Sequence, residues 1–146
     1  MFKAFNEELV VKTKKNFEII DLTSDAERFV KKSNVKNGTI TITTQHTTTS
    51  VRVNENEKLL LKDIEKHLSE IVPIKDYNHD NIKARECPPN EPKNAHSHLK
   101  ALLMGASETL PIINGKIKLG QWQHILFFEL DGPRERRVTF SFIGES

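Results

Sequence analysis

Two periodicities alternate along the chain and predict a mixture of strands and helices. Residues 39–43 alternate threonine with isoleucine, which places Ile40 and Ile42 on one face of a strand. Residues 57–72 change to helical spacing, and Pro73 marks the end of that helix. The apolar positions of the helical stretch are Leu60, Ile64, Leu68 and Ile71. A stripe of this kind is typical of core packing, so we expect these side chains to be buried.

The first forty residues predict two short strands and a helix. Residues 9–11 and 17–20 are β-type runs that we interpret as an early pair of strands. Residues 24–27, Ser-Asp-Ala-Glu, form a capping-box pattern, so a short helix should follow and end before Gly38. Its buried side should carry Phe29 and Val30.

A hairpin is the clearest local signal in the last third of the chain. Asn114-Gly115 separates the β-type runs 110–113 and 116–119, and both residues tolerate the positive φ that a tight turn requires. Residues 123–130 predict a further strand, followed by a turn at 131–133. Residues 137–143 then alternate, and one side of this strand carries Val138, Phe140 and Phe142. Earlier in the chain, Val51 and Val53 continue a β pattern.

The segment 73–94 interrupts this regularity. It holds four of the six prolines, the only tyrosine and the only cysteine, so it is neither a regular helix nor a central strand. Loops of this length inside a compact domain are usually functional or disordered. Residues 95–104 predict a short helix that Gly105 terminates.

Together these elements predict one α+β domain over residues 1–146, built on a largely antiparallel sheet or sandwich with two or three helices. Hydrophobic residues are 36% and charged residues 29%, which excludes a disordered polyelectrolyte. The net charge of +2 gives no case for nucleic-acid binding. One cysteine, Cys87, permits no internal disulfide, and no apolar run approaches the ~20 residues that span a bilayer. Residues 1–8 carry no leader pattern, so we expect a cytoplasmic protein without a membrane partner.

Histidines are the first candidates for chemistry. His46 follows the strand 39–43, His79 lies in the proline-rich loop, and His96 and His98 open the next segment. The spacing matches no standard zinc motif. Three neutral imidazoles converging from separate elements would form a sensible zinc site with one position open, whereas scattered surface histidines are the alternative.

Carboxylates and hydroxyls accompany these histidines. Asp80 and Glu55 could orient an imidazole, bind Mg²⁺ or act as a general base, and Asp80 could equally be an ordinary turn residue. Residues 47–50 present four successive hydroxyls, which either hold phosphate oxygens or reflect β propensity alone. The same choice, phosphate binding or a solvated strand end, applies to the arginines Arg134, Arg136 and Arg137.

Other residues receive no catalytic role from the sequence. Trp122 is interpreted as a core residue, and Cys87 has no activating neighbour in sequence. His67 falls on the predicted helix 57–72 and His124 inside the predicted strand 123–130, and neither is assigned a function.

Several short motifs occur in an order that resembles the YjbQ family, also named secondary thiamine-phosphate synthase, over residues 40–144. The matching pieces are Gln45-His46-Thr47-Thr48, Asn54-Glu55, Tyr77-Asn78-His79-Asp80, Ser97-His98-Leu99-Lys100 with Met104-Gly105, Leu110-Pro111, Gly115-Lys116-Ile117, Gly120-Gln121-Trp122-Gln123, and Asp131-Gly132-Pro133-Arg134 with Arg136-Arg137. Each piece is weak by itself, and the ordered set is specific.

The resemblance implies a compact α+β fold that assembles as a homotrimer with sites near subunit boundaries. It places His46, His79, Asp80 and His98 at the family's characteristic polar positions, and it favours His98 over His96. It also assigns Asn54 and Gln123 to substrate binding. The family name implies joining an aminopyrimidine diphosphate to a thiazole phosphate, with release of pyrophosphate. The chain carries neither a glycine-rich phosphate loop nor an aspartate-rich diphosphate motif, so the physiological substrate could differ.

The leading hypothesis is an enzyme that acts on a small phosphorylated substrate. A divalent metal, zinc rather than magnesium, would be bound by His46, His79 and His98, with Asp80 as base or orienting group and Glu55 as its helper. The phosphate contacts would come from Thr47, Thr48, Arg134, Arg136 and Arg137. The alternatives are a non-catalytic metal- or ligand-binding trimer and a metal-dependent hydrolase.

Overall fold

The computed structural model describes residues 1–146 and contains two antiparallel sheets. The larger sheet has the order β1-β8-β3-β5-β6, with β1 (Phe2–Lys12), β8 (Glu135–Glu145), β3 (Asn37–Thr44), β5 (Ser107–Ile113) and β6 (Lys116–Ile117). The smaller sheet has the order β2-β7-β4, with β2 (Glu18–Asp21), β7 (His124–Glu129) and β4 (Thr49–Asn54). The helices are α1 (Thr23–Ser33), α2 (Lys58–Ile71) and α3 (Ala95–Met104), and two 3₁₀ turns, Asn78–Asp80 and Ile82–Ala84, lie in the long loop. The predicted α+β class with antiparallel sheets and three helices is confirmed.

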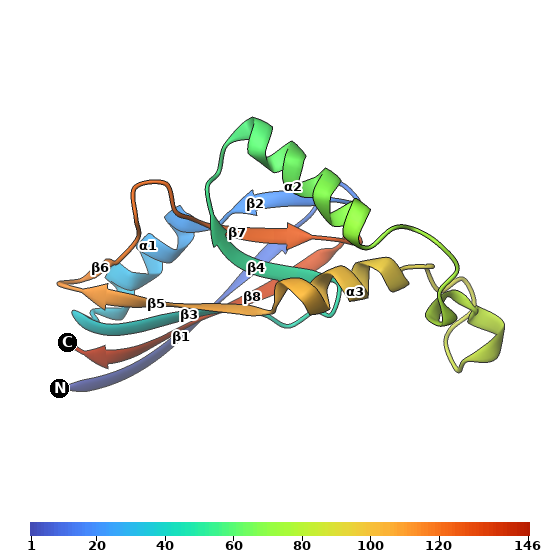
Figure 1. The fold of residues 1–146 in the computed structure, drawn as a ribbon. Helices are drawn as coiled ribbons and strands as arrows, with labels where there is room; N and C mark the ends of the chain where they lie inside the picture. Colours follow the sequence, from blue (N-terminus) through green and yellow to red (C-terminus); the bar gives the residue numbers. More distant parts are fainter.

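The layers follow from which faces of the sheets are apolar. Figure 1 shows the large sheet on one side, the small sheet with α2 above it, and α1 beside them. The main core cluster lies between these elements and includes Ile40, Ile42, Phe127 and Phe140, each fully buried. The face of the large sheet away from the small sheet carries no helix, and the segment 73–94 extends from one end of the molecule (Figure 1).

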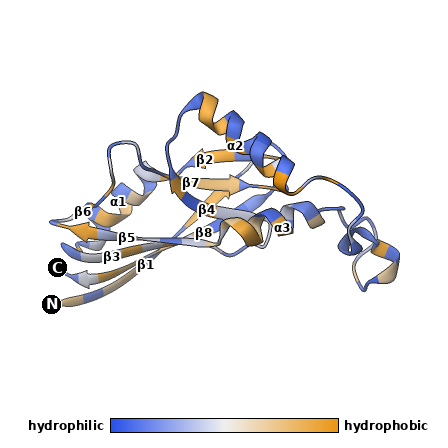
Figure 2. Ribbon diagram, viewed as in Figure 1, coloured by the Kyte–Doolittle hydropathy of each residue, from blue (hydrophilic) through white to orange (hydrophobic).

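Strand β7 separates two apolar clusters because both of its faces are buried. Ile125 and Phe127 point into the main core, whereas Leu126 and Phe128 belong to a second cluster with Ala101 of α3. Figure 2 shows the resulting continuous hydrophobic stretch along β7. A strand that is buried on both faces loses the alternating pattern of a half-exposed strand.

The N-terminal expectations hold in part. Helix α1 buries Phe29 and Val30 as predicted and ends before Gly38. The two early strands exist but do not pair with each other, because β1 pairs with β8 and β2 pairs with β7. The capping box does not form either, since the N-cap of α1 is Leu22, two residues before Ser24, and it has no side-chain hydrogen bond. Instead, the carboxylate of Asp21 accepts a hydrogen bond from the amide of Thr23 at 2.8 Å.

Five predicted core positions are not buried: Leu60, Ile64, Leu68 and Ile71 of α2, and Trp122. Helix α2 has the predicted bounds but contains no fully buried residue, and Ile71 is 52% exposed. Only Leu61 and Ile64 of this helix pack against the second cluster, because α2 covers the outer face of the small sheet, away from the main core. Trp122 is 65% exposed, so the prediction that it packs in the core is wrong for the single chain.

The C-terminal half follows the sequence closely. Asn114 and Gly115 have positive φ values of 51° and 76° and connect β5 to β6 in the expected hairpin. Helix α3 spans the predicted residues and ends at Gly105, whose φ is 102°. Each of the three α-helices is too short or too polar to qualify as a membrane-spanning segment.

Candidate functional site

A polar cleft of about 320 Å³ lies where three segments of the chain meet. These segments are the turn between β3 and β4, the first turn of α3 with the loop before it, and the start of β8. No apolar side chain lines the cleft. The lining residues are Gln45, His46, Thr47, Thr48, Glu91, Asn94, His98, Arg134 and Arg136. The sequence placed six of these residues among its candidates, and folding brings all six together.

Hydroxyl groups fix the turn that carries His46. The Oγ1 atoms of Thr44 and Thr49 lie 2.6 Å apart and are buried, and Oγ1 of Thr49 donates to the carbonyl of His46 at 3.3 Å. The amide of His46 donates to Oγ1 of Thr44 at 3.4 Å. The threonine side chains therefore fix the conformation of this turn through hydrogen bonds, and they also favour the strand conformation.

A buried ion pair supports the floor of the cleft. Arg136 binds Glu129 in a bidentate manner, with nitrogen–oxygen distances of 2.8 and 2.6 Å, and the two side chains are 5% and 0% exposed. The same Nη2 atom of Arg136 donates to Oγ1 of Thr48 at 2.9 Å, and Thr13 donates to Glu129 at 2.7 Å. Arg136 thus uses most of its N–H donors in hydrogen bonds to Glu129 and Thr48, and it holds the Thr48 hydroxyl in place.

The charge state of Glu129 follows from these contacts. Burial by itself raises the pKa of Glu129, but hydrogen bonds from Arg136, Thr13 and the amide of Asp131, with the positive charge of Arg136, outweigh it and lower the pKa below its ordinary value. Glu129 is therefore ionised, and the pair is a true ion pair at neutral pH.

Arg134 and Asn94 are oriented by one carboxylate at the rim. Asp131 accepts from Nη2 of Arg134 at 2.9 Å and from Nδ2 of Asn94 at 2.7 Å. The carbonyl side of Asn94, Oδ1, is buried and has no partner. Arg134 remains 43% exposed, so its guanidinium retains donors that face the solvent-filled cleft.

His79 and His98 come into direct contact from distant parts of the sequence. Their ring centroids lie 4.8 Å apart at an interplanar angle of 61°. Nδ1 of His79 is buried without a hydrogen-bond partner, which is costly for a polar atom. The loop is held in position by Arg85, whose Nε donates to the carbonyl of His79 at 2.8 Å.

Asp80 connects the long loop to α3. Its Oδ1 accepts from the amide of Ala95, at the start of α3, at 3.1 Å and lies 4.0 Å from Nδ1 of His79. The carboxylate therefore lies at the positive end of the helix, where negative charge is favoured. Asp80 is adjacent to the histidine pair, but at 4.0 Å its carboxylate forms no hydrogen bond with His79.

Three imidazoles near the cleft have pKa values below the ordinary histidine value. Burial is the main cause for His46, with the charge of Arg136 adding to it, and burial with the neighbouring His79 acts on His98. Burial and the charge of Lys100 lower the pKa of His96. These rings are therefore neutral at pH 7, the state in which imidazole accepts a proton or binds a metal ion.

The single chain does not assemble a complete metal site. No group of three or more His, Cys, Asp or Glu side chains lies close enough to hold one ion. His79 and His98 form a pair, whereas Nε2 of His46 accepts a hydrogen bond from the amide of Arg137 at 2.9 Å. Two rings that share a tetrahedral zinc ion at about 2.0–2.1 Å have centroids roughly 5 Å apart, a separation close to the 4.8 Å of this pair.

Some predicted site residues lie away from the cleft. Asn54 and Glu55 are at the far end of β4, and Gln123 precedes the strand residue His124 that pairs with Asn54. Strand β4 starts beside the cleft, and at about 3.3 Å per residue its far end is roughly 17 Å away. Within one chain, these three side chains therefore do not join Asp80.

Arg137 also points elsewhere. Its Nη1 donates to Glu8 of the neighbouring strand β1 at 2.7 Å, and both side chains are about half exposed. Only its backbone amide reaches the site, through His46. Alternation along β8 explains the difference, because Arg136 and Arg137 project to opposite faces of the sheet.

The sequence missed a histidine–carboxylate pair at the far end of the small sheet. Nδ1 of His124 lies 2.6 Å from Oδ2 of Asp21, which also accepts from Asn56 at 2.8 Å. Asp21 and His124 are 103 residues apart, so only the pairing of β2 with β7 could have indicated the contact.

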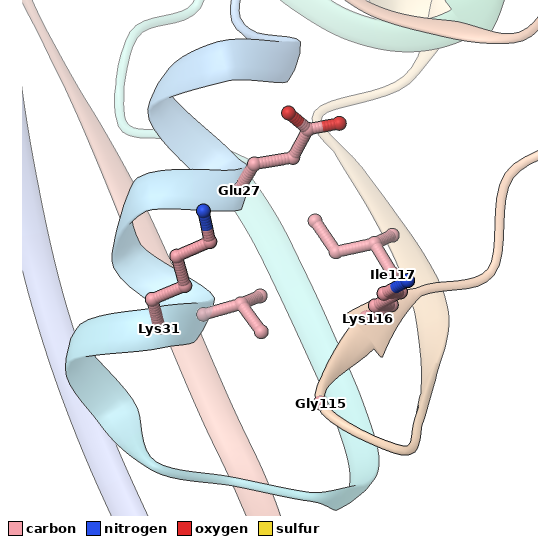
Figure 3. Close-up of a pocket in the computed structure, with 6 residues that line it drawn as sticks. Glu27, Lys31, Gly115, Lys116 and Ile117 are labelled. Carbon is pink, nitrogen blue, oxygen red and sulfur yellow. The ribbon is translucent and has the colours of Figure 1, made fainter.

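Other depressions lie on the surface. One of about 400 Å³ adjoins the cleft, shares His46, Thr47 and His98 with it, and is otherwise lined mainly by α3. A wider one of about 510 Å³ lies along the long loop and contains Asp80. A third, of about 300 Å³, lies between α1 and the β5–β6 hairpin, and the charged side chains that line it are exposed (Figure 3). The polar cleft is the candidate site because it gathers six of the residues that the sequence singled out.

Comparison with known proteins identifies the class to which this fold and cleft belong. Residues 7–145 match the model of the family described as UPF0047 protein YjbQ-like, and the chain belongs to that family. A UPF0047 protein of Methanothermobacter thermautotrophicus is 40% identical over 98% of this chain and 94% of its own length. One from Archaeoglobus fulgidus is 45% identical over 90% of this chain and 95% of its own length.

Solved structures agree with the fold. A YjbQ-like protein of unknown function from Sulfolobus solfataricus P2 superposes with a TM-score of 0.91 at 36% identity and covers 99% of this chain and 100% of its own. A hypothetical protein from Aeropyrum pernix K1 gives a TM-score of 0.87 at 34% identity over 97% and 99% of the two chains. The compact two-sheet architecture is therefore that of the family.

Proposed function

We propose that the polar cleft is the active site of an enzyme that acts on a small phosphorylated substrate, with a secondary thiamine-phosphate synthase reaction as the leading candidate. The observation that carries the proposal is the lining of the cleft: neutral imidazoles, threonine hydroxyls and an exposed arginine converge with no apolar side chain between them. Arginine and hydroxyl groups in this combination suit phosphate oxygens. A purely structural polar cluster would pair its members with one another, whereas Thr47 and much of Arg134 stay open.

In this proposal each residue of the cleft has a separate task. Thr47 and Arg134 bind phosphate oxygens directly, and Thr48 is held towards them by Arg136 at 2.9 Å. Asp80, next to His79, accepts a proton or orients that ring. Fixed donors of this kind stabilise charge as it develops on a departing phosphate or pyrophosphate.

We propose that a divalent metal, zinc in preference to magnesium, is held by His79 and His98. The buried, unpartnered Nδ1 of His79 supports this proposal, because an imidazole nitrogen in that setting lacks the partner it needs. Nitrogen donors favour zinc over magnesium. Two imidazoles leave coordination positions that the substrate, water or a second chain would fill, and the bound ion would act as a Lewis acid on a phosphate oxygen.

A homotrimer would explain why family motifs lie at both ends of the small sheet. The outer surface of α3 beside the cleft exposes Leu102 and Leu103 by 80% and 66%. Figure 2 shows this hydrophobic end of α3. Adjacent exposed apolar side chains mark association surfaces, and a neighbouring copy could bring its own Glu55, Asn54 and Gln123 to this cleft.

The assembly is tested by light scattering of the purified protein. We expect three times the chain mass of 16.8 kDa, and a shift to the monomer mass in Leu102→Glu. Leu59→Glu on α2, a position exposed by 65%, is the matched control and should keep the wild-type mass. A monomeric wild-type protein would contradict the trimer.

The enzyme proposal is tested with protein purified without added metal. We expect stoichiometric zinc by elemental analysis, and pyrophosphate release from an aminopyrimidine diphosphate and a thiazole phosphate that a chelator abolishes. His98→Ala should lose both zinc and turnover, and Asp80→Asn, which keeps an acceptor for the Ala95 amide, should lose turnover alone. His67→Ala, at an exposed position of α2, is the control and should change neither.

The alternatives make different predictions in the same assays. A hydrolase would release phosphate from a panel of phosphorylated substrates without needing the second one. A non-catalytic binding protein would hold zinc and show no turnover with any of them. Full activity in both His98→Ala and Asp80→Asn would refute the assignment of the site.

A further inference from the structure

His46 is held at the cleft by contacts that leave one polar ring atom free. Strand β3 pairs with β8 as far as Thr44 opposite Val138, where β3 ends. The next amide of β8 towards the cleft, that of Arg137, would have no acceptor if the ladder simply stopped. Nε2 of His46 takes that place at 2.9 Å, so the ring continues the hydrogen-bond pattern of the sheet beyond the strand.

This hydrogen bond fixes the tautomer of His46. A backbone amide can only donate, so Nε2 must carry a lone pair and no proton. A neutral imidazole carries one proton, which then resides on Nδ1. The ring is neutral at pH 7 because burial and the charge of Arg136 oppose its protonation. Nδ1 forms no hydrogen bond with the protein and is not among the buried polar atoms without a partner, so it is accessible to solvent on a ring that lines the cleft.

The surroundings of Nδ1 determine what it can bind. Thr47 and Arg134 line the same cleft and keep donors open, whereas Nε2 of Gln45 already donates to Thr139 at 2.8 Å. Glu91 is the one carboxylate in the lining, and the charge of Arg136 below it is paired with Glu129. An N–H group among donors and positive charge recognises an oxyanion. A metal ion would need a free lone pair on the ring, and neither nitrogen of His46 has one while the Arg137 bond is intact.

We propose that His46 is a hydrogen-bond donor to an oxygen of the bound phosphate or diphosphate, through its Nδ1–H, and not a ligand of the metal ion. This assignment rests on the proposed function for the identity of the anion, whereas the tautomer rests on the fold alone. It separates the cleft into two parts, an oxyanion site at His46, Thr47 and Arg134 and a cation site at His79 and His98. The buried Arg136–Glu129 pair and Arg137 are then positioning residues for the first part.

Two substitutions divide the roles of the two ring nitrogens. The variant His46→Asn places an amide N–H near the position of Nδ1 and has no acceptor at the position of Nε2. In the variant His46→Gln, the side-chain oxygen reaches the position of Nε2 and accepts from the Arg137 amide. This variant lacks the donor near Nδ1. Isothermal titration of the purified protein with inorganic pyrophosphate, without added metal, measures the consequence.

The donor role predicts that the two variants differ in a definite direction. His46→Gln should bind pyrophosphate about 10- to 100-fold more weakly than wild type, the loss of one hydrogen bond to a charged group. His46→Asn should stay within about threefold of wild type, by the same reasoning. Zinc content should be unchanged in both variants and lost in His98→Ala. Equal affinities of His46→Gln and wild type, or loss of zinc in His46→Asn, would overturn the assignment.

The tautomer is read independently in the wild-type protein, so the test survives if a variant fails to fold. Long-range ¹H–¹⁵N correlation spectra of histidine-labelled protein should show the His46 ring protonated at Nδ1 and unprotonated at Nε2. A ring protonated at Nε2 would refute the tautomer. If the tautomer is found but wild type binds no pyrophosphate, the proposed function fails and the donor role fails with it. If wild type binds and the tautomer is reversed, only the role of His46 fails.

Discussion

Removal of the charge on Glu129 is the sharpest test of how the cleft is built. Glu129→Gln keeps the shape of the side chain but leaves the guanidinium of Arg136 without its counter-charge at a position that is 5% exposed. Breaking one partner of a buried ion pair costs about 3–5 kcal/mol of unfolding free energy. At about 4 °C per kcal/mol for a chain of this size, the melting temperature should fall by roughly 12–20 °C.

The adjacent arginine supplies the matched control. Arg137 pairs with Glu8 at 2.7 Å, but both side chains are about half exposed, so Glu8→Gln should cost about 0–1 kcal/mol. Thermal unfolding by circular dichroism and urea titration compare the two variants under one set of conditions. Equal stability of Glu129→Gln and Glu8→Gln would refute the view that the Arg136–Glu129 pair holds the cleft together.

The same pair predicts a dependence of stability on pH. Because the pKa of Glu129 is lower in the folded protein than in the unfolded chain, its contribution is present above the unfolded pKa and is lost as the pH falls through the folded one. Glu129→Gln removes this contribution. The acid limb of a plot of melting temperature against pH should therefore be shallower in the variant than in wild type, and parallel limbs would contradict the assignment.

Two further predictions concern the strands and the histidines. A Cβ atom on Gly38 would lie 2.0 Å from the carbonyl oxygen of Ile143, so Gly38→Ala should lower the free energy of unfolding, measured by urea titration, by at least about 1–3 kcal/mol. The control is Gly120→Ala, whose new Cβ atom meets only a flexible glutamine side chain. Its free energy of unfolding should stay within about 0.5 kcal/mol of wild type. Burial lowers the pKa of His96 and His98 below the ordinary value. The unfolded chain therefore binds more protons at these two rings than the folded protein does as the pH falls, and the melting temperature should decrease between about pH 7.5 and about pH 5.5. This fall should be smaller in His96→Gln, and an equal fall in the variant would show that protonation of His96 does not set it.

Local patterns in the sequence predicted the elements well where residues that are neighbours in the chain determine the structure. The alternation around Ile40 and the Asn114-Gly115 turn need only short-range chemistry, and both are found as expected. The strand pairings were harder, because β1 and β8 are joined over more than 120 residues and no local signal specifies that partner. The same reason explains the error on the capping box, because Asp21, held by the β2–β7 pairing, accepts from the amide of Thr23 and α1 begins before Ser24.

The candidate site shows a similar division. Residue types and motif order indicated His79, His98 and Thr48, which do reach one region of the molecule. They could not indicate that Arg136 is buried against Glu129. Glu129 lies on β7, where almost every position is buried, so no periodicity shows which side chain faces Arg136. Nor could they show that Glu55 lies at the far end of β4, since strand direction is set by tertiary pairing.

The central claim is that one cleft holds a cation and a phosphorylated ligand side by side. Crystals grown with zinc and inorganic pyrophosphate, measured by anomalous diffraction at the zinc edge, test it directly. The account predicts an anomalous peak at about 2.0–2.1 Å from ring nitrogens of His79 and His98, with pyrophosphate against Thr47 and Arg134. Zinc bound only elsewhere, such as at His124, or a cleft without pyrophosphate at saturating concentration, would contradict it.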